Sequence, residues 1–155
     1  MRLKDKVAIV TGAGWGMGAS TAELFAAEGA CVMVTDILDA EGTDVAARIN
    51  DSGGQARFLT LDVTNDTGWA SVVGETISTF GQIDILVNNA GVSGSHPDLL
   101  NTQTWGEQMN VNARGVFLGM QAVIPQMQKA GAGSIVNISS ISGIVGQSFV
   151  HMGYN

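Results

Sequence analysis

The sequence predicts an α/β fold in which helices cover both faces of a parallel sheet. Short β-branched apolar runs alternate with helical patterns along all 155 residues, as in repeated β-α-β units. Apolar residues make up 45% of the chain and charged residues only 14%, and glycine occurs 21 times without a three-residue period. This composition is typical of a sheet buried on both faces with tight turns, and it excludes disorder and collagen.

Hydrophobic periodicity places the elements. The predicted strands are 7–11, 31–35, 56–61, 83–87 and 134–139, and the predicted helices are 16–28, 40–50, 67–80 and 102–129. Gly29, Gly53 and Gly81 stand where three of these helices should stop. We expect the last helix to be interrupted or kinked near residues 112–115 and again near Pro125. No linker or repeat divides the chain, so we predict a single domain over residues 1–155.

Charge and composition also restrict the partners. The net charge of −7 argues against a nucleic-acid partner, because phosphate backbones are bound by basic surfaces. No apolar run approaches the roughly 18 residues of a membrane span, and no signal sequence precedes the first strand. The lone Cys31 is expected to be a small buried apolar residue. We expect a cytoplasmic protein with a small-molecule substrate, no metal, and neither a nucleic-acid nor a membrane partner.

The turn between the first strand and the first helix is rich in glycine. Glycines there let the backbone approach a pyrophosphate, and the start of the helix offers free N–H groups. The spacing of Gly12, Gly16 and Gly18 fits the strand end. The common Gly-x-Gly-x-x-Gly pattern fails when it is counted from Gly12, because Met17 holds its third glycine position. A glycine-rich turn on its own is about as often free of ligand as it is part of a binding site.

A carboxylate strengthens the case. Asp36 ends the second strand, 18 residues after Gly18, where an acid can accept hydrogen bonds from an adenosine ribose. The two features together predict dinucleotide binding in a Rossmann-like, doubly wound, three-layer sheet. Asp36 would repel a ribose 2′-phosphate, and Trp15 and Ile37 occupy the neighbouring positions where a cation would be needed. The predicted cofactor is therefore NAD(H) rather than NADP(H).

Further candidates follow the third and fourth strands. Asp62 either lies near the adenine or is a helix N-cap or strand-end acid, and Asn88 and Asn89 either face the cofactor or only satisfy backbone groups. The short residues after them, Ala90 and Gly91, would allow close approach to the cofactor. The predicted cofactor-binding residues are Gly12, Gly14, Trp15, Gly16, Met17, Gly18, Asp36, Ile37, Asp62, Val63, Asn88, Ala90 and Gly91.

The sequence resembles the short-chain dehydrogenase/reductase family, of the NAD(H)-dependent type, in motifs that extend over the whole chain. They are Thr11-Gly12-x-x-x-Gly16-x-Gly18, Asp62-Val63, Asn88-Asn89-Ala90-Gly91, Asn112, Ser139-Ser140 and Tyr154. The resemblance implies hydride transfer between NAD(H) and a secondary alcohol or ketone. It also implies that the parent protein is a homotetramer or homodimer.

The resemblance implies catalytic roles for three residues. Tyr154 would be the general acid/base, Ser140 would stabilise charge on the substrate oxygen, and Asn112 would hold a water in a proton relay. Each has an ordinary alternative: a half-buried aromatic, a turn former and a residue that fills a helix break. His96 and His151 are expected on the surface or at a pocket rim.

Two features depart from the family. Ser140 and Tyr154 are 14 residues apart, one more than usual, which a one-residue insertion between them explains. The family's lysine, four residues after the tyrosine, would fall beyond Asn155. The fifth strand would also form an exposed apolar sheet edge. We interpret the chain as the N-terminal part of a longer enzyme and expect the 155 residues by themselves to be inactive or nearly so. The alternative is a non-catalytic NAD-binding fragment or pseudoenzyme.

Overall fold

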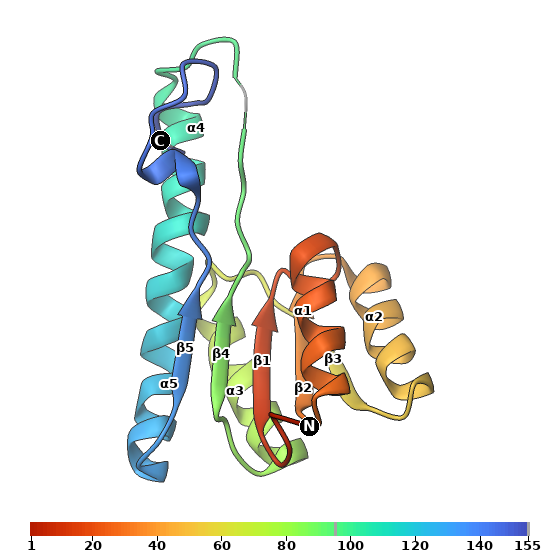
Figure 1. The fold of residues 1–155 in the computed structure, drawn as a ribbon. Coiled ribbons are helices and arrows are strands. Elements are labelled where there is room, and N and C mark those ends of the chain that lie inside the picture. Colours follow the sequence, from red (N-terminus) through yellow and green to blue (C-terminus); the bar gives the residue numbers. More distant parts are fainter. Residues whose placement is uncertain (95, 155) are drawn as a thin grey trace.

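A five-stranded parallel sheet forms the centre of the computed structural model, which describes residues 1–94 and 96–154 (Figure 1). The strands are β1 (Val7–Thr11), β2 (Cys31–Asp36), β3 (Gln55–Thr60), β4 (Ile85–Asn88) and β5 (Ser134–Asn137). Their order is β3-β2-β1-β4-β5, and the described pairings are parallel. The order reverses between β1 and β4, as it does in doubly wound sheets.

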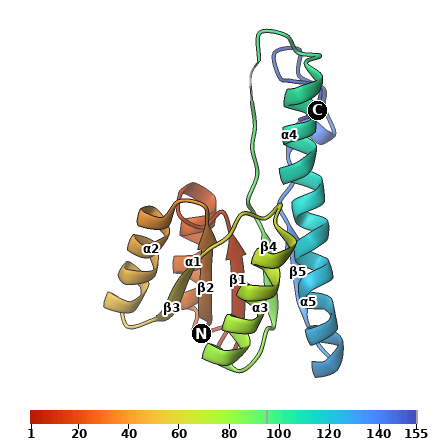
Figure 2. The ribbon, with the colours of Figure 1, turned by 180° about the vertical axis from the view of Figure 1, so that it is seen from behind.

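Helices cover both faces of the sheet, which confirms the predicted three-layer fold (Figures 1 and 2). On one face α1 (Gly16–Ala27) and α2 (Asp39–Asp51) form a core with Val10, and on the other α3 (Asp66–Phe80) and α5 (Val116–Ala130) form a core with Ile9. Val10 and Ile9 are both fully buried, because successive side chains of a strand point to opposite faces.

The long predicted helix is interrupted at one of the two expected places. Between α4 (Thr102–Met109) and α5 lies a π-helical turn, η1 (Asn110–Gly115), and the three together form a column that extends beyond the strands (Figure 1). The helix is not interrupted at Pro125, which lies inside α5. Because proline has no N–H group, the backbone carbonyl of Gln121, one turn earlier, has no helical donor. Pro125 and Gln121 are both exposed, so water can hydrogen-bond to that carbonyl.

Several element ends differ from the prediction. The fourth strand starts at residue 85 rather than 83, and the fifth ends at 137 rather than 139. As predicted, β5 is an edge strand, and three of its four residues are exposed.

Cys31 is only partly buried, contrary to expectation, because it begins β2, where its Sγ donates to Gln55 Oε1 (3.3 Å). Burial nevertheless raises the pKa of this thiol, with a smaller contribution from Asp5. Within the described ranges, no helix is both long enough and apolar enough to cross a bilayer.

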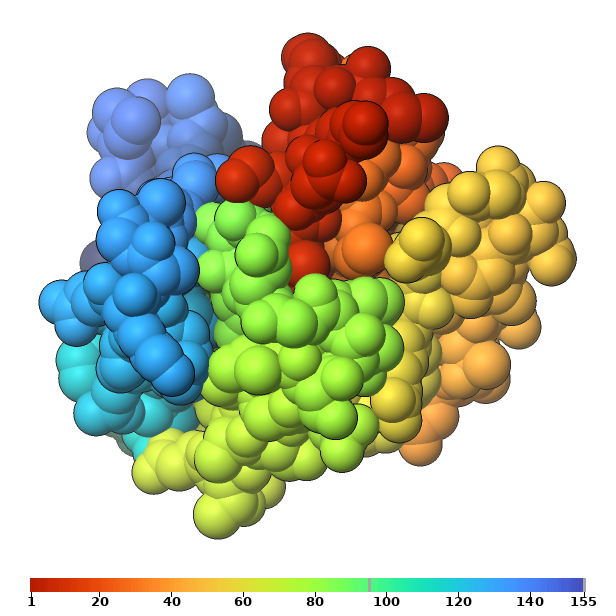
Figure 3. All heavy atoms as spheres, turned by 90° about the horizontal axis from the view of Figure 1, so that it is seen from below, coloured from red at the N-terminus to blue at the C-terminus, as the bar shows by residue number. Residues whose placement is uncertain are grey.

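The layer formed by α3 and α5 is closely packed. The two helices lie side by side when the molecule is seen from below (Figure 3), and Gly119 of α5 contacts the buried indole of Trp69 from α3. A Cβ at Gly119 would lie 2.9 Å from the indole and 2.6 Å from Asn88 Oδ1. The absence of a side chain at Gly119 therefore lets α5 approach both α3 and β4.

We predict that Gly119→Ala lowers the free energy of unfolding by about 1–3 kcal/mol, the usual cost of overpacking a core. Gly74→Ala in α3 is the matched control, because a Cβ there meets open space. It should raise the free energy of unfolding by up to about 1 kcal/mol through helix propensity. Urea denaturation of both variants measures the difference, and equal effects would contradict the packing argument.

Candidate functional site

The carboxyl ends of β1 and β4 are joined by side-chain hydrogen bonds. The Thr11 hydroxyl oxygen accepts the backbone N–H groups of Asn89 and Ala90, both at 3.0 Å. The Asn89 amide nitrogen donates to the carbonyl oxygens of Thr11 (2.9 Å) and Gly12 (3.0 Å). Asn89 thus satisfies backbone groups, one of its two expected roles, and it also lines the cleft described below. These bonds fix the crevice at the point where the strand order reverses, which is where doubly wound sheets bind ligands.

Glycines allow the backbone to approach this crevice closely. A Cβ at Gly12 would lie 2.7 Å from the Cα of Ala90, and one at Gly18 would overlap the carbonyl oxygen of Gly12. Gly16 has a φ of +58° with open space around it, a conformation that glycine adopts readily. The glycines therefore pack α1 against the end of β1 and leave the backbone at Gly16 accessible.

The start of α1 has no side-chain cap. Trp15 is the N-cap residue, and its side chain makes no capping hydrogen bond. The first N–H groups of a helix have no intrahelical partner, and together with the helix dipole they attract phosphate. These free donors, next to glycines whose missing side chains keep the turn open, fit the pyrophosphate of a dinucleotide.

Asp36 has a fixed orientation beside this turn. Its side chain is buried, and its two carboxylate oxygens accept the N–H groups of Gly14 (2.8 Å) and Leu38 (3.1 Å). A carboxylate offers about four lone-pair sites, so capacity remains for further donors such as ribose hydroxyls. The acid that the sequence singles out is therefore held in one position by the turn that it faces.

These elements border a cleft of about 620 Å³, within the range of small-molecule sites. The predicted residues in its lining are Gly12, Trp15, Gly16, Met17, Asp36, Ile37, Asp62, Val63, Ala90 and Gly91. The other three predicted residues are not in that lining. Gly14 donates to Asp36, Gly18 packs beneath Gly12, and Asn88 donates to Asn137 Oδ1 across β4 and β5 (2.9 Å).

The cleft also contains residues that sequence reasoning did not single out for the cofactor. They are Leu61, Thr64, Val92, Glu107, Asn110 and Val111. Asn110 and Val111 belong to η1, and the predicted break in the long helix was the available signal, because π turns often occur at functional sites.

Asp62 is a strand-end acid rather than a helix N-cap. Its Oδ1 accepts the backbone N–H (2.9 Å) and the hydroxyl (2.7 Å) of Thr64, whereas the side chain of Asn65 caps α3. The local bonds of Asp62 form a turn that brings Thr64 to the cleft. Its predicted contact with adenine is a separate matter and stays a prediction.

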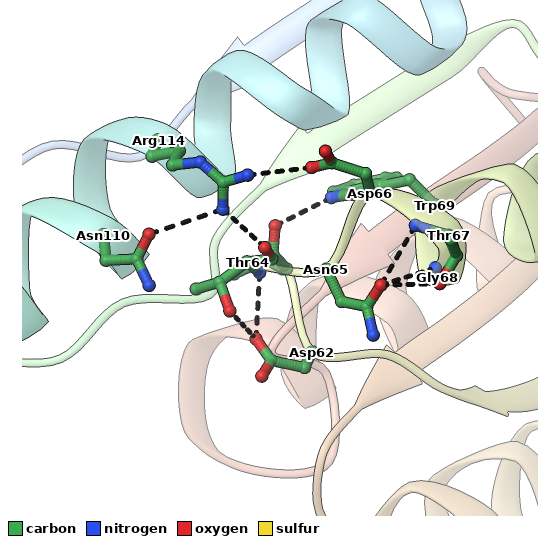
Figure 4. A network of polar contacts seen from close by, with 10 residues as sticks. Asp62, Thr64, Asn65, Asp66, Thr67, Gly68, Trp69, Asn110 and Arg114 are labelled. Carbon is green, nitrogen blue, oxygen red and sulfur yellow. Dashed lines mark hydrogen bonds and ion pairs between the residues drawn. The ribbon is translucent and has the colours of Figure 1, made fainter.

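A polar network connects the loop after β3 to η1 (Figure 4). Arg114 donates to the carbonyl oxygen of Thr64 (2.6 Å) and pairs with Asp66 (2.9 Å). The Trp69 indole N–H donates to the carbonyl oxygen of Val63 (2.9 Å). The two segments of the cleft wall that come from distant parts of the sequence are thereby held together.

The three catalytic candidates form hydrogen bonds with neighbouring residues. Asn112 forms two 2.8 Å hydrogen bonds with the backbone of Val92, and the Ser140 hydroxyl accepts the N–H of Ser142 (3.2 Å) at the start of η2 (Ile141–Gly143). The backbone N–H of Tyr154 donates to the carbonyl oxygen of His151 (2.9 Å). None of these three candidates belongs to the described lining of the cleft, and their catalytic roles stay predictions.

The expectation for His151 is wrong. Its side chain is fully buried rather than at the surface or at a rim, and its ring nitrogens lie 3.0 Å from Gly153 N and 3.0 Å from Asn101 O. A buried polar side chain is stable when it is hydrogen-bonded, and these two contacts provide that. His96 is only partly buried, as expected.

The strand order and the glycine-lined crevice between β1 and β4 define a Rossmann-like α/β protein. The chain belongs to the short-chain dehydrogenase family, whose sequence pattern matches residues 6–154. This membership, which the sequence motifs predicted, implies a nicotinamide dinucleotide as cofactor.

Several proteins are similar to this chain. A 3-alpha-(or 20-beta)-hydroxysteroid dehydrogenase of Mycobacterium tuberculosis is 46% identical over 97% of this chain and 57% of its own length. A cyclopentanol dehydrogenase of Comamonas testosteroni is 44% identical over 94% of this chain and 58% of its own length. A crystal structure described as a short-chain dehydrogenase/reductase from Burkholderia xenovorans superposes with a TM-score of 0.92 at 36% identity, covering 99% of this chain and 61% of that one. The chain thus spans less than two thirds of the length of these relatives.

We predict that Arg114→Met lowers the free energy of unfolding by about 1 kcal/mol more than Arg48→Met. Arg48 is the matched control, because it makes a comparably exposed ion pair, with Glu23 at 2.8 Å. Exposed pairs contribute about 0–1 kcal/mol, but Arg114 also donates to a backbone carbonyl, whose loss costs further. Urea denaturation distinguishes the two, and equal losses would show that the bond to Thr64 contributes nothing.

Proposed function

We propose that this chain binds NAD(H) and takes part in hydride transfer to or from a secondary alcohol or ketone. The observation that carries the proposal is Asp36, fixed by two backbone N–H groups and set in the cleft beside the uncapped start of α1. The helix N-terminus suits the pyrophosphate, and the carboxylate suits the adenosine ribose. When bound, the nicotinamide ring would accept or supply the hydride.

Electrostatics favours NAD(H) over NADP(H). The lining of the cleft, within the described residues, contains the carboxylates of Asp36, Asp62 and Glu107 and neither lysine nor arginine. A 2′-phosphate beside Asp36 would place like charges together in a partly desolvated site, and no lining cation would offset the repulsion.

The residues of the chain have separate tasks in this proposal. The first turn of α1 holds the pyrophosphate, and Asp36 orients the adenosine half of the cofactor. Tyr154 exchanges a proton with the substrate oxygen, Ser140 donates a hydrogen bond to that oxygen, and Asn112 holds a water that relays the proton. These three assignments come from the family resemblance, residue by residue.

The names of the relatives suggest the substrate class. They include a 3-alpha-(or 20-beta)-hydroxysteroid dehydrogenase, a cyclopentanol dehydrogenase and a trans-4-hydroxycyclohexanecarboxylate dehydrogenase. Each name describes an alcohol built on carbon rings, with the hydroxyl on a ring carbon except at position 20 of the steroid, which lies in the side chain. We therefore propose an alicyclic secondary alcohol, or the corresponding ketone, as the substrate. The exposed apolar side chains of Ile141, Ile144 and Phe149 agree with an apolar substrate.

We predict that NAD+ binds about tenfold or more tightly than NADP+, and that Asp36→Ala weakens NAD+ binding by about tenfold while removing most of the preference. Isothermal titration calorimetry measures both affinities. Asp51→Ala, at the end of α2, is the matched control, because it removes the same charge away from the cleft. Equal NAD+ affinity in wild type and Asp36→Ala would refute the assignment of Asp36.

We predict that Tyr154→Phe, made in a protein of the relatives' full length, lowers turnover of cyclopentanol with NAD+ by about 100-fold or more, the usual contribution of a general acid/base. NAD+ affinity should change by less than about threefold, because the phenol acts on the substrate. Release of NADH, followed by absorbance, measures turnover. Undiminished turnover in the variant would contradict the role of Tyr154. NAD+ binding without any turnover in that longer protein would favour the alternative, a non-catalytic NAD-binding segment.

A further inference from the structure

The imidazole of His151 takes no part in the proposed reaction, yet both of its nitrogens have partners. The side chain is 0% exposed. Its Nδ1 lies 3.0 Å from the backbone nitrogen of Gly153, and its Nε2 lies 3.0 Å from the carbonyl oxygen of Asn101. Asn101 is the N-cap residue of α4, and Gly153 directly precedes Tyr154. The ring thus connects a helix start to the segment that carries the proposed acid/base.

These two partners determine the proton positions on the ring. A backbone N–H can only donate, so Nδ1 accepts from Gly153 and carries no proton. A carbonyl oxygen can only accept, so Nε2 carries the proton and donates to Asn101. The imidazole is therefore neutral, because a second proton on Nδ1 would oppose the N–H of Gly153.

The side chain of Gln108 also indicates that Nδ1 of His151 carries no proton. Its Oε1 lies 3.3 Å from Nδ1, but two acceptors form no hydrogen bond. Its Nε2 is buried and has no partner among the described residues. Because the two orientations of an amide are nearly equal in shape, the reversed amide places Nε2 against Nδ1 and satisfies that donor. Nδ1 then accepts from Gly153 and from Gln108 of α4.

The turn that carries Tyr154 is closed around this ring. The carbonyl oxygen of His151 accepts the N–H of Tyr154 (2.9 Å), and Met152 N donates to the carbonyl oxygen of Leu99 (3.2 Å). Figure 1 shows this terminal segment beside α4, beyond the strands. The position of Tyr154 therefore depends on contacts between its turn and the start of α4, where Asn101 precedes His151 by 50 residues.

We propose that His151 is a positioning residue whose neutral, Nε2-protonated ring fixes the turn bearing Tyr154 against the first turn of α4. The relevance of this positioning to catalysis rests on the proposed function of Tyr154. The positioning itself can be measured without cofactor or turnover, so the two proposals can fail separately.

The test uses NMR on the chain with uniform ¹⁵N labelling, which reports both the histidine rings and the Gly153 amide, and with ¹³C-labelled tyrosine. We expect His151 to be the Nε2-protonated tautomer and the Gly153 amide to exchange slowly with solvent. Tyr154 is the only tyrosine in the sequence, so its ring signals report on the turn directly. His96→Asn is the control that assigns the histidine signals, and it should leave the signals of Gly153 and Tyr154 unchanged.

Two variants replace the bonds of His151 one at a time. His151→Asn places an oxygen near the position of Nδ1 and keeps an acceptor for Gly153, whereas His151→Gln keeps a donor for Asn101 and loses that acceptor. We expect Gly153 exchange within about threefold of wild type in the first variant and about tenfold or more faster in the second, with a shift of the Tyr154 signals.

Three results would overturn the proposal. The first is a wild-type His151 with its proton on Nδ1, or with both nitrogens protonated. The second is Gly153 exchange and Tyr154 signals in His151→Gln that match those of wild type. The third is equal disturbance of the turn by both variants. The wild-type tautomer keeps the test decisive if a variant does not fold, and a failure to bind NAD+ would count only against the proposed function.

Discussion

The hydrogen bonds between the carboxyl ends of β1 and β4 are the constraint on which the candidate site depends. Thr11 receives two N–H groups from the segment after β4, and Asn89 returns two bonds to the end of β1. The parallel register of the strands, with Val10 beside Val87, brings these residues level. The glycine turn, the start of α1 and the β4 loop then border one cleft, which would open if the two strand ends separated.

The sequence predicts the parts of the site that depend on local order along the chain. A strand, a glycine turn and a helix place Gly12 and Gly16 without reference to the rest of the molecule, and Asp36 follows because it ends the next strand. Asn110 and Val111 differ, because they line the cleft from a helix distant in sequence. The polar run near residue 112 indicates a break there, but which residues of a π turn face the cleft depends on tertiary packing.

The remaining differences between prediction and structure have two causes: neighbouring residues compete for one capping role, and some side chains contact residues far away in the sequence. Asp62 and Asn65 are both plausible N-caps for α3, and only the geometry of the turn selects Asn65 while Asp62 binds Thr64. The environment of His151 depends on Gln108, 43 residues earlier, and no pattern in the intervening sequence reveals that contact. A lone histidine is ambiguous in sequence for this reason, because its ring is equally suited to a wet surface and to a fully hydrogen-bonded interior.

The charges of the cleft require that an anionic cofactor be recognised by the backbone. The described lining contains three carboxylates and no lysine or arginine, so attraction to a pyrophosphate comes from the N–H groups and dipole at the start of α1. Backbone donors do not titrate, and they occupy positions set by helix geometry. In the proposed function they would fix where two phosphates lie, while Asp36, at the end of β2 facing this turn, would make a third phosphate unfavourable. In the proposed function, the backbone donors thus supply the phosphate site, while Asp36 adds affinity for the ribose and sets the cofactor preference. A change at Asp36 would therefore alter the preference without removing the phosphate site.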